Sequence, residues 1–482
     1  MIDLRPVGYV IGLLVAVLGA TMLLPLLIDL YDGNGHWPVF AIAGFLSCLS
    51  GGLLAIACFN GTGEGLTIQQ TFILTSTVWL ALPVFGALPF WIGATEARFV
   101  DAFFEAMSGL TTTGSTVFTG LELLPRGILL WRGLLQWFGG IGIIVVAMVF
   151  LPMLKVGGMQ IFRTESFDTL GKILPRAAEI ASRISVIYFV LTALCVIAYA
   201  FVGLSPFDAL VHALTTLSTG GFSTSDASFG AYRGPAEYVA AIFMILASLP
   251  FVRYVQLIAG TAKPLLRDSQ ARDYMLLIFL IVLVLTAYRI QVNGDFLEPS
   301  VREALFNVTS IISGTGYSSV DYQLWGSFPI ALFFLIGLIG GCAGSTSCSV
   351  KIFRYQLLIA SLRAQVRKIH TPHGIFIPRY EGRAVADDVL SSVMAFFMLF
   401  MVSLAVLAVL LALTGLDMIT SISGAATALA NVGPGLGPEI GPAGNFATLN
   451  DGAKWLLIIG MLIGRLELMS VYILFTIGFW RR

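Results

Sequence analysis

Four short clusters of Gly, Thr and Ser recur along this 482-residue chain, each at the end of a semi-apolar segment. The clusters can be aligned on Gly114, Gly221, Gly316 and Gly435. Glycine permits backbone angles that other residues avoid, so carbonyl oxygens can turn toward a common axis there. A ring of carbonyl oxygens from four loops can replace the hydration shell of a cation. The clusters therefore predict a cation-binding ring.

The residues that precede the aligned glycines are also similar in type. The first three segments have an acid thirteen positions before the glycine and a polar residue nine positions before it. The acids are Asp101, Asp208 and Glu303, with Ile422 in the fourth segment, and the polar residues are Glu105, His212 and Asn307, with Ala426 in the fourth. We expect His212 to pack behind its loop rather than to bind an ion. One such cluster alone is typical of an ordinary loop, whereas four in register favour a pore.

The candidate ion-binding residues are the glycine of each cluster and the two residues before it. They are Thr112, Thr113, Gly114, Thr219, Gly220, Gly221, Gly314, Thr315, Gly316, Gly433, Pro434 and Gly435. Non-helical backbone at membrane depth is tolerated only where it is buried in protein or lines an aqueous cavity. A short helix before each loop would aim its negative C-terminal end at the ion.

The composition indicates that lipid surrounds most of the chain. Hydrophobic residues make up 57% of it and charged residues only 11%, against roughly 25% charged in soluble domains. Apolar runs of about 20 residues predict membrane spans. We expect ten, at 8–30, 38–59, 70–93, 128–152, 184–203, 236–260, 273–291, 327–352, 388–414 and 453–480. Four segments are too short to cross, at 99–114, 205–221, 298–316 and 416–435.

The placement of the charges predicts the topology. Basic residues concentrate in 153–183, 261–272 and 351–387 and at the C-terminus, and basic loops of membrane proteins face the cytoplasm. Both termini are therefore expected in the cytoplasm, with the four short segments entering from outside. The 27 basic and 27 acidic residues balance, so no nucleic-acid partner is expected. The five cysteines are expected to be ordinary buried thiols, without a metal site.

Ten small residues, Gly340 to Ser349, interrupt the predicted span at 327–352. Glycine weakens a helix by about 1 kcal/mol relative to Ala, and hydroxyl groups compete for its backbone hydrogen bonds. The stretch therefore predicts an unwound loop, with close helix packing as the alternative. Its candidate gate residues are Gly340, Gly341, Gly344, Ser345 and Thr346.

Arg465 falls inside the last predicted span. A charge at the bilayer centre costs about 2.5–3.5 kcal/mol on insertion scales, so this side chain should face the protein interior or water. An ion pair with Glu467 is one interpretation, although residues two apart point to different faces of a helix. The other places Arg465 beside the Gly340–Ser349 stretch, as a positive barrier to cations within a gate.

Taken together, these motifs resemble the Trk/Ktr/HKT superfamily of potassium transporters, and in particular its bacterial TrkH branch. The resemblance covers essentially the whole chain. It rests on Thr111–Gly114, Ser218–Phe222, Ser313–Tyr317, Asn431–Gly435, Gly340–Thr346 and Gly464–Glu467. Relatives commonly have Ser-Gly-Gly where this chain has Ser347-Cys348-Ser349.

The resemblance implies an all-α integral membrane protein in which four pseudo-symmetric helix–pore loop–helix repeats surround one ion pore. The expected units are two N-terminal transmembrane helices (1–66) and pore repeats at 67–155, 156–265, 266–360 and 361–482. It implies potassium uptake across the bacterial inner membrane, with potassium ion bound in the filter and no cofactor or enzymatic activity. The implied partners are a second copy of the chain, a cytoplasmic nucleotide-binding ring of the TrkA type and membrane lipid.

Two further questions stay open from the residues alone. A secondary transporter that works by alternating access would also use internal repeats and broken helices. Such a transporter typically needs a pair of broken elements, whereas a filter needs four loops around one axis. The basic residues of 351–387 fit either a membrane surface or a docking face for the regulatory ring.

Overall fold

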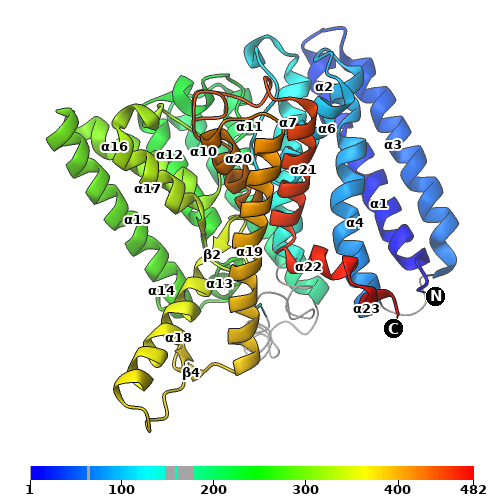
Figure 1. The fold of residues 1–482 in the computed structure, drawn as a ribbon. Coiled ribbons are helices and arrows are strands. Elements are labelled where there is room, and N and C mark those ends of the chain that lie inside the picture. The colour runs from blue at the N-terminus through cyan, green and yellow to red at the C-terminus, as the bar shows by residue number, and fades with distance from the viewer. Residues whose placement is uncertain (1, 62–65, 147–157, 160–176, 482) are drawn as a thin grey trace.

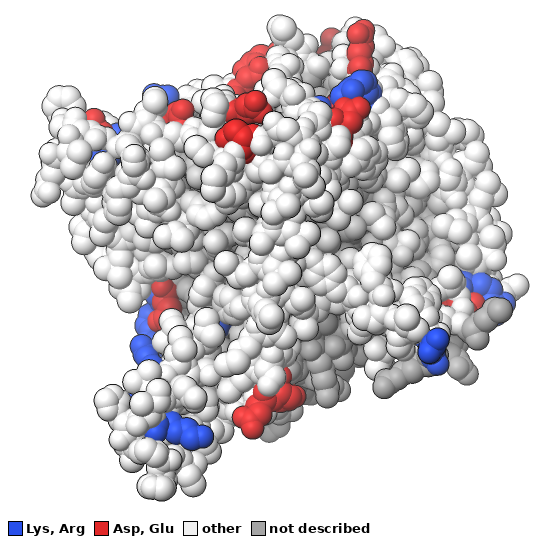
Figure 2. Space-filling view, in the orientation of Figure 1, with Lys and Arg blue, Asp and Glu red and all other residues white. Residues whose placement is uncertain are grey.

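The computed structural model in Figure 1 describes residues 2–61, 66–146, 158–159 and 177–481. This part of the chain is mostly helical, as predicted. Within it, seven helices are long and apolar enough to cross a membrane, or nine if each of two bent pairs counts as one span. The charged residues in Figure 2 lie mostly toward two opposite ends of the molecule, with a broad uncharged band between them.

The N-terminal part is a pair of packed spans. Helices α1 (Arg5–Thr21) and α2 (Leu23–Tyr31) form the first, and α3 (Trp37–Cys58) the second, followed by the short helix η1 (Phe59–Gly61). A Cβ atom added at Gly12 would lie 2.6 Å from the backbone nitrogen of Ala55, and one at Gly51 would lie 2.5 Å from that of Ala16. Small residues let membrane helices approach in this way.

Four units of long helix, short helix and long helix follow (Figure 1). The first contains α4 (Ile68–Gly86), α5 (Leu88–Ile92), α6 (Phe99–Leu110), η2 (Leu121–Leu123) and α7 (Arg126–Val145). The second contains α10 (Ala177–Phe201), α11 (Pro206–Leu217), η4 (Ser228–Tyr232), α12 (Pro235–Ser248), α13 (Phe251–Ile258) and α14 (Lys263–Leu266).

The other two units are less regular on their second long helix. The third contains α15 (Ser269–Tyr288), the π-helical η5 (Arg289–Asn293), α16 (Leu297–Ser313), η6 (Tyr322–Trp325), α17 (Ser327–Gly337), β1 (Ile339–Gly340), β2 (Val350–Lys351) and α18 (Ile352–His370). The fourth contains β3 (Arg379–Tyr380), β4 (Arg383–Ala384), α19 (Asp387–Leu413), α20 (Met418–Ala430), α21 (Asp451–Arg465), α22 (Met469–Tyr472), η7 (Ile473–Phe475) and α23 (Ile477–Trp480).

The four short segments form the expected short helices, α6, α11, α16 and α20. The C-terminal half of each is buried throughout, at residues 102–110, 211–217, 306–313 and 423–430. These helices therefore end inside the protein, where non-helical backbone can follow them without meeting lipid.

Two of the ten predicted spans are wrong as continuous helices. The segment 236–260 bends by 90° between α12 and α13, and 453–480 bends by 104° between α21 and α22. In 327–352 the predicted interruption is present, since the helix α17 has only 11 residues before the chain leaves it. Pro250 stands at the first bend, and proline disfavours helical backbone at the residue before it. The end of the predicted span at 128–152 lies outside the described residues.

Candidate ion pathway

The backbone after each short helix makes the same turn. The helix ends and a residue adopts a left-handed conformation, with φ between 50° and 80°. These residues are Thr112, Thr219, Gly314 and Asn431. Two positions later stands a glycine, and in the first three segments its φ is also positive: Gly114, Gly221 and Gly316. Glycine adopts this conformation readily, and asparagine is one of the few other residues that visits it routinely.

The four turns lie against one another in a closed cycle, which we call the loop ring. A Cβ atom added at Gly114 would overlap the carbonyl oxygen of Gly220, and one at Gly221 would overlap that of Thr315. A Cβ at Gly316 would lie 2.6 Å from the nitrogen of Gly433. The cycle closes because a Cβ at Gly433 would lie 3.2 Å from the carbonyl oxygen of Thr113.

The fourth turn corrects the alignment of the sequence. Asn431 takes the left-handed position of Thr112, so Gly433 rather than Gly435 corresponds to Gly114. A Cβ at Gly435 would meet Ile440 and Ser423 instead of a neighbouring turn. The alignment on Gly435 was therefore wrong by two residues, and Val432 takes the position assigned to Pro434. The residue that indicates the correct alignment in the sequence is Asn431, because asparagine, like glycine, can end a helix in the left-handed conformation.

The polar residues of the short helices brace the loops. His212 Nε2 lies 3.0 Å from Ser223 Oγ, and Asn307 Nδ2 donates to Ser319 Oγ at 3.0 Å. The Glu105 carboxylate accepts from the backbone nitrogen of Val117 at 2.9 Å. The position of His212 behind its loop agrees with the prediction for this residue.

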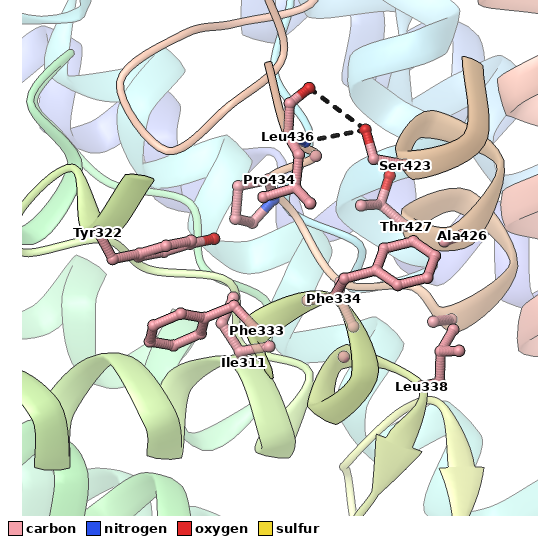
Figure 3. A pocket seen from close by; sticks show the side chains of 14 residues that line it. Ile311, Tyr322, Phe333, Phe334, Leu338, Ser423, Ala426, Thr427, Pro434 and Leu436 are labelled. Atoms are coloured by element: carbon pink, nitrogen blue, oxygen red, sulfur yellow. Dashed lines mark hydrogen bonds between the residues drawn. The ribbon is translucent and has the colours of Figure 1, made fainter. Parts of the chain in front are cut away.

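In the fourth segment neither Ala426 nor Ile422 provides such a brace. Ser423 does so instead, since its hydroxyl accepts from the nitrogen of Leu436 at 2.9 Å and donates to the oxygen of Leu436 at 3.3 Å. Figure 3 shows this side chain facing the backbone of Leu436, beside a small cavity of about 30 Å³ behind Pro434.

Two residues of α7 connect the first unit to the second loop, and the sequence did not point to either. Gln136 Nε2 donates to the carbonyl oxygen of Gly220 at 2.6 Å, and its Oε1 accepts from the nitrogen of Phe222 at 3.0 Å. Arg132 pairs with Glu105 at 2.8 Å and donates to the oxygen of Ser223 at 2.7 Å. All of these side chains are buried, so the ring rests on a desolvated polar scaffold.

The acids at the earlier position anchor the starts of the helices. Asp101 pairs with buried Lys454 at 2.7 Å, and Glu303 with buried Arg289 at 2.9 Å. Asp208 accepts from the hydroxyl groups of Ser205 and Thr224. These carboxylates make structural contacts away from the loop ring.

A polar cavity of about 150 Å³ adjoins the loop ring. It lies on the side of the ring opposite the short helices, where the chain continues after each turn. All four turns line it through Gly114, Gly221, Gly316 and Gly433. Asp226 from the second loop also lines it. A hydrated cation can therefore reach all four turns from one space.

The Gly340–Ser349 stretch lies on the other side of the ring, and we call it the inner loop. Parallel pairing of β1 with β2 closes its base. The nitrogen of Phe251 donates to the oxygen of Gly344 at 3.0 Å, and that of Cys342 donates to Ser248 at 3.0 Å. The inner loop thus occupies the bend between α12 and α13 and satisfies backbone groups that the break leaves free. The prediction of an unwound stretch, rather than a close-packed helix, agrees with this structure.

Each candidate gate residue has a defined place in the inner loop. A Cβ at Gly340 would overlap the oxygen of Cys348, and Gly341 donates its N–H to Ser347 Oγ at 2.8 Å. Gly344 has a positive φ of 71°. Ser345 and Thr346 donate their hydroxyl groups to the carbonyls of Cys342 and Ala247.

Arg465 is the last residue of α21 and is only 3% exposed. Its guanidinium donates to Cys348 Sγ at 2.7 Å and to the carbonyl oxygen of Gly139 at 3.2 Å. Cys348 Sγ in turn lies 3.4 Å from the hydroxyl oxygen of Thr112. The arginine, the inner loop and the start of the first turn are therefore in contact.

The alternative prediction was an ion pair between Arg465 and Glu467. In the structure the carboxylate of Glu467 pairs with Arg354 instead. Lys351 donates to the carbonyl oxygen of Ser347 in the inner loop. Arg354 and Lys351 are both buried. Neither interpretation of the basic residues of 351–387, as a membrane surface or as a docking face, holds for these two, because both point into the protein.

A model of the TrkH family, described as a cation transport protein, matches residues 36–479. The chain belongs to this family. It is 43% identical over 479 residues to the Trk system potassium uptake protein TrkI of Halomonas elongata, covering 99% of this chain and 97% of that protein. It is 35% identical to TrkH of Escherichia coli K12, with 99% of each chain covered.

The fold agrees with the family as well. The crystal structure of the potassium transporter TrkH from Vibrio parahaemolyticus matches with a TM-score of 0.92 and 32% identity, over 100% of both chains. The predicted family and all-α membrane fold are thus confirmed, and the chain is a membrane transporter rather than an enzyme.

Proposed function

We propose that this TrkH-family chain takes up potassium ions through a gated pore whose selectivity filter is the loop ring. The observation that carries the proposal is the closed cycle of four turns, in which each ring glycine abuts the next turn. Four loops at the ends of buried helices present backbone dipoles to one axis, which suits a partly dehydrated monovalent cation. The names of the relatives, which are potassium uptake proteins, support the same ion.

The inner loop and Arg465 form the proposed gate. The inner loop lies against the start of the filter through Cys348 and Thr112, and Arg465 adds a buried positive charge at the same level. A fixed positive charge beside the path raises the energy of a passing cation. Movement of the inner loop with Arg465 would then open the path.

The remaining parts of the proposal concern the setting of the pore. We place the chain in the bacterial inner membrane with both termini in the cytoplasm, as a homodimer on a TrkA-type nucleotide-binding ring. We keep the division into two N-terminal helices and four repeats, but we move two of the predicted boundaries, at 265 and 360, to the ends of α14 and α18 so that neither helix is divided. The exposed side chains of Arg363, Arg367 and Lys368 on α18 are the proposed contact with the regulatory ring.

The proposal can be tested with ⁸⁶Rb⁺ uptake into proteoliposomes that contain the purified chain and an excess of internal K⁺. We expect uptake that external K⁺ inhibits and that external Na⁺ inhibits much less. The same assay with and without a proton gradient separates a passive pore from a coupled transporter. A flux that requires the gradient and saturates like a carrier would favour alternating access.

A further inference from the structure

An apolar groove of about 430 Å³ lies between α1, α4 and α7, outside the loop ring but close to its first turn. Its volume falls within the range of small-molecule sites, roughly 300–1,000 Å³. The described residues that line it carry no charge. Its two threonines, Thr21 and Thr75, donate their hydroxyl groups to carbonyls of their own helices. A cavity with such walls stays dry and takes apolar occupants.

The groove opens onto the outer surface of a membrane span. Leu14 and Val17 line it and are 38% and 60% exposed. Both lie near the middle of the span Arg5–Tyr31, at the depth where lipid tails rather than headgroups are found. The groove is therefore continuous with the lipid-facing surface of this membrane transporter.

The inner end of the groove reaches the contacts of Arg465. Gly139 lines it, and its carbonyl oxygen accepts from Arg465. Trp79 also lines it, with its ring centroid 5.6 Å from the Arg465 guanidinium carbon. Leu110, the last residue of α6, completes this end. An occupant would touch side chains that support both the proposed gate and the first turn.

We propose that this groove binds an acyl chain of a bilayer phospholipid. The acyl chain packs against Trp79 and supports the contact of Trp79 with Arg465. The consequence for ion flux rests on the proposed function, whereas the binding itself does not. The apolar walls and the midplane depth favour a lipid tail over a polar solute. A second copy of this chain covering the groove is the competing occupant, and the experiment separates the two.

The experiment uses the full chain in nanodiscs of phosphatidylethanolamine and phosphatidylglycerol, with a photoreactive diazirine near the end of the phosphatidylethanolamine acyl chain. After irradiation, mass spectrometry should find the label on groove peptides that contain Val78 or Phe138. Two substitutions fill the groove from opposite walls, Leu14→Trp and Gly142→Leu. A Cβ at Gly142 has room, because its nearest neighbour is Trp79 at 3.8 Å.

Each filling variant has a matched control on the outer surface. Leu13→Trp changes a neighbouring residue of α1 that is 44% exposed and does not line the groove. Gly52→Leu adds a side chain on α3, where a Cβ has no neighbour within 4 Å. Label on the groove peptides should fall roughly tenfold in the filling variants, because the added side chain occupies the space, and should persist in the controls. Gel filtration and thermal unfolding show which variants are folded.

The outcomes are distinct. Equal groove labelling in filled and control variants would overturn the acyl-chain site. So would groove peptides that stay unlabelled in the parent chain, as they would if a second copy of the chain covered the groove. If the label behaves as expected, ⁸⁶Rb⁺ flux should differ between the filled variants and their controls. Equal flux in all four would overturn the support of Arg465 while leaving the lipid site in place. Because labelling is read without ion flux, an inactive pore does not affect that result.

Discussion

The loop ring and the inner loop are neighbouring parts of the proposed ion path, in contact through Cys348 and Thr112, but they are built in different ways. The ring repeats one backbone turn four times, and each turn abuts the next. The inner loop and Arg465 each occur once, and side-chain contacts through Cys348 join them. A repeated backbone ring can fix one ion size at an axis, whereas single side chains can move without disturbing it. We therefore expect damage to the ring to change ion choice, and damage to the inner region to change only the rate.

The largest effect should come from the buried scaffold of the ring. Glu105→Ala leaves Arg132 buried without the carboxylate that it contacts at 2.8 Å. Breaking a buried pair in this way typically costs about 3–5 kcal/mol. Thermal unfolding of the purified variant should show this loss. As a control, Glu439→Ala removes an exposed carboxylate, and equal destabilisation by both would contradict the special role of Glu105.

A side chain in the ring should reduce selectivity. In Gly316→Ser the new Cβ would lie 2.6 Å from the nitrogen of Gly433, and φ at this position is 81°. The turns must therefore move apart, and we expect the preference for K⁺ over Na⁺ to fall by roughly tenfold, about 1.4 kcal/mol. Competition of K⁺ and Na⁺ with ⁸⁶Rb⁺ uptake measures this preference. Unchanged selectivity would remove Gly316 from the filter.

The register of the fourth turn can be tested with a pair of variants. Gly433→Ala places a methyl group 3.2 Å from the oxygen of Thr113, in the ring, whereas Gly435→Ala meets mainly the tip of Ile440. We expect a selectivity loss of a few-fold in the first variant and none in the second. The opposite result would restore the alignment on Gly435.

Removal of the proposed gate should raise flux without changing ion choice. Arg465→Ala removes the charge beside Cys348, and a deletion within 341–348 shortens the inner loop. Each should increase closed-state ⁸⁶Rb⁺ flux about tenfold, which corresponds to a barrier lower by about 1.4 kcal/mol. Arg465→Lys, which keeps the charge, is the control. Wild-type flux in both folded variants would leave Arg465 as a structural residue.

The smallest expected effect is on assembly with the regulatory ring. Charge reversal of Arg363, Arg367 and Lys368 together should weaken co-purification with the TrkA-type partner, because all three are exposed on α18. Arg233→Glu, exposed after the second loop, should have no effect. An unchanged complex at physiological salt would assign these residues to the membrane surface, where exposed charges also reside.

The sequence by itself determined the membrane class, the four short helices, the glycine turns of the first three and the break in the third unit. These features are local: an apolar run of fixed length requires a span, and a cluster of glycines and hydroxyls cannot remain a helix. The polar residues at Glu105, His212 and Asn307 were visible as a pattern, but their hydrogen bonds to the loops were not.

Only the tertiary structure decided how the segments meet. The bends at Pro250 and after Arg465 lie in runs apolar enough to cross the membrane, so hydrophobicity could not distinguish them from straight spans. Leu468 adopts a φ of 44° at the second bend, which its residue type disfavours. The fourth turn begins at Asn431 because that residue tolerates the left-handed conformation. The contact of Arg465 with Cys348 joins two segments far apart in the chain, and no local rule specifies such a pair.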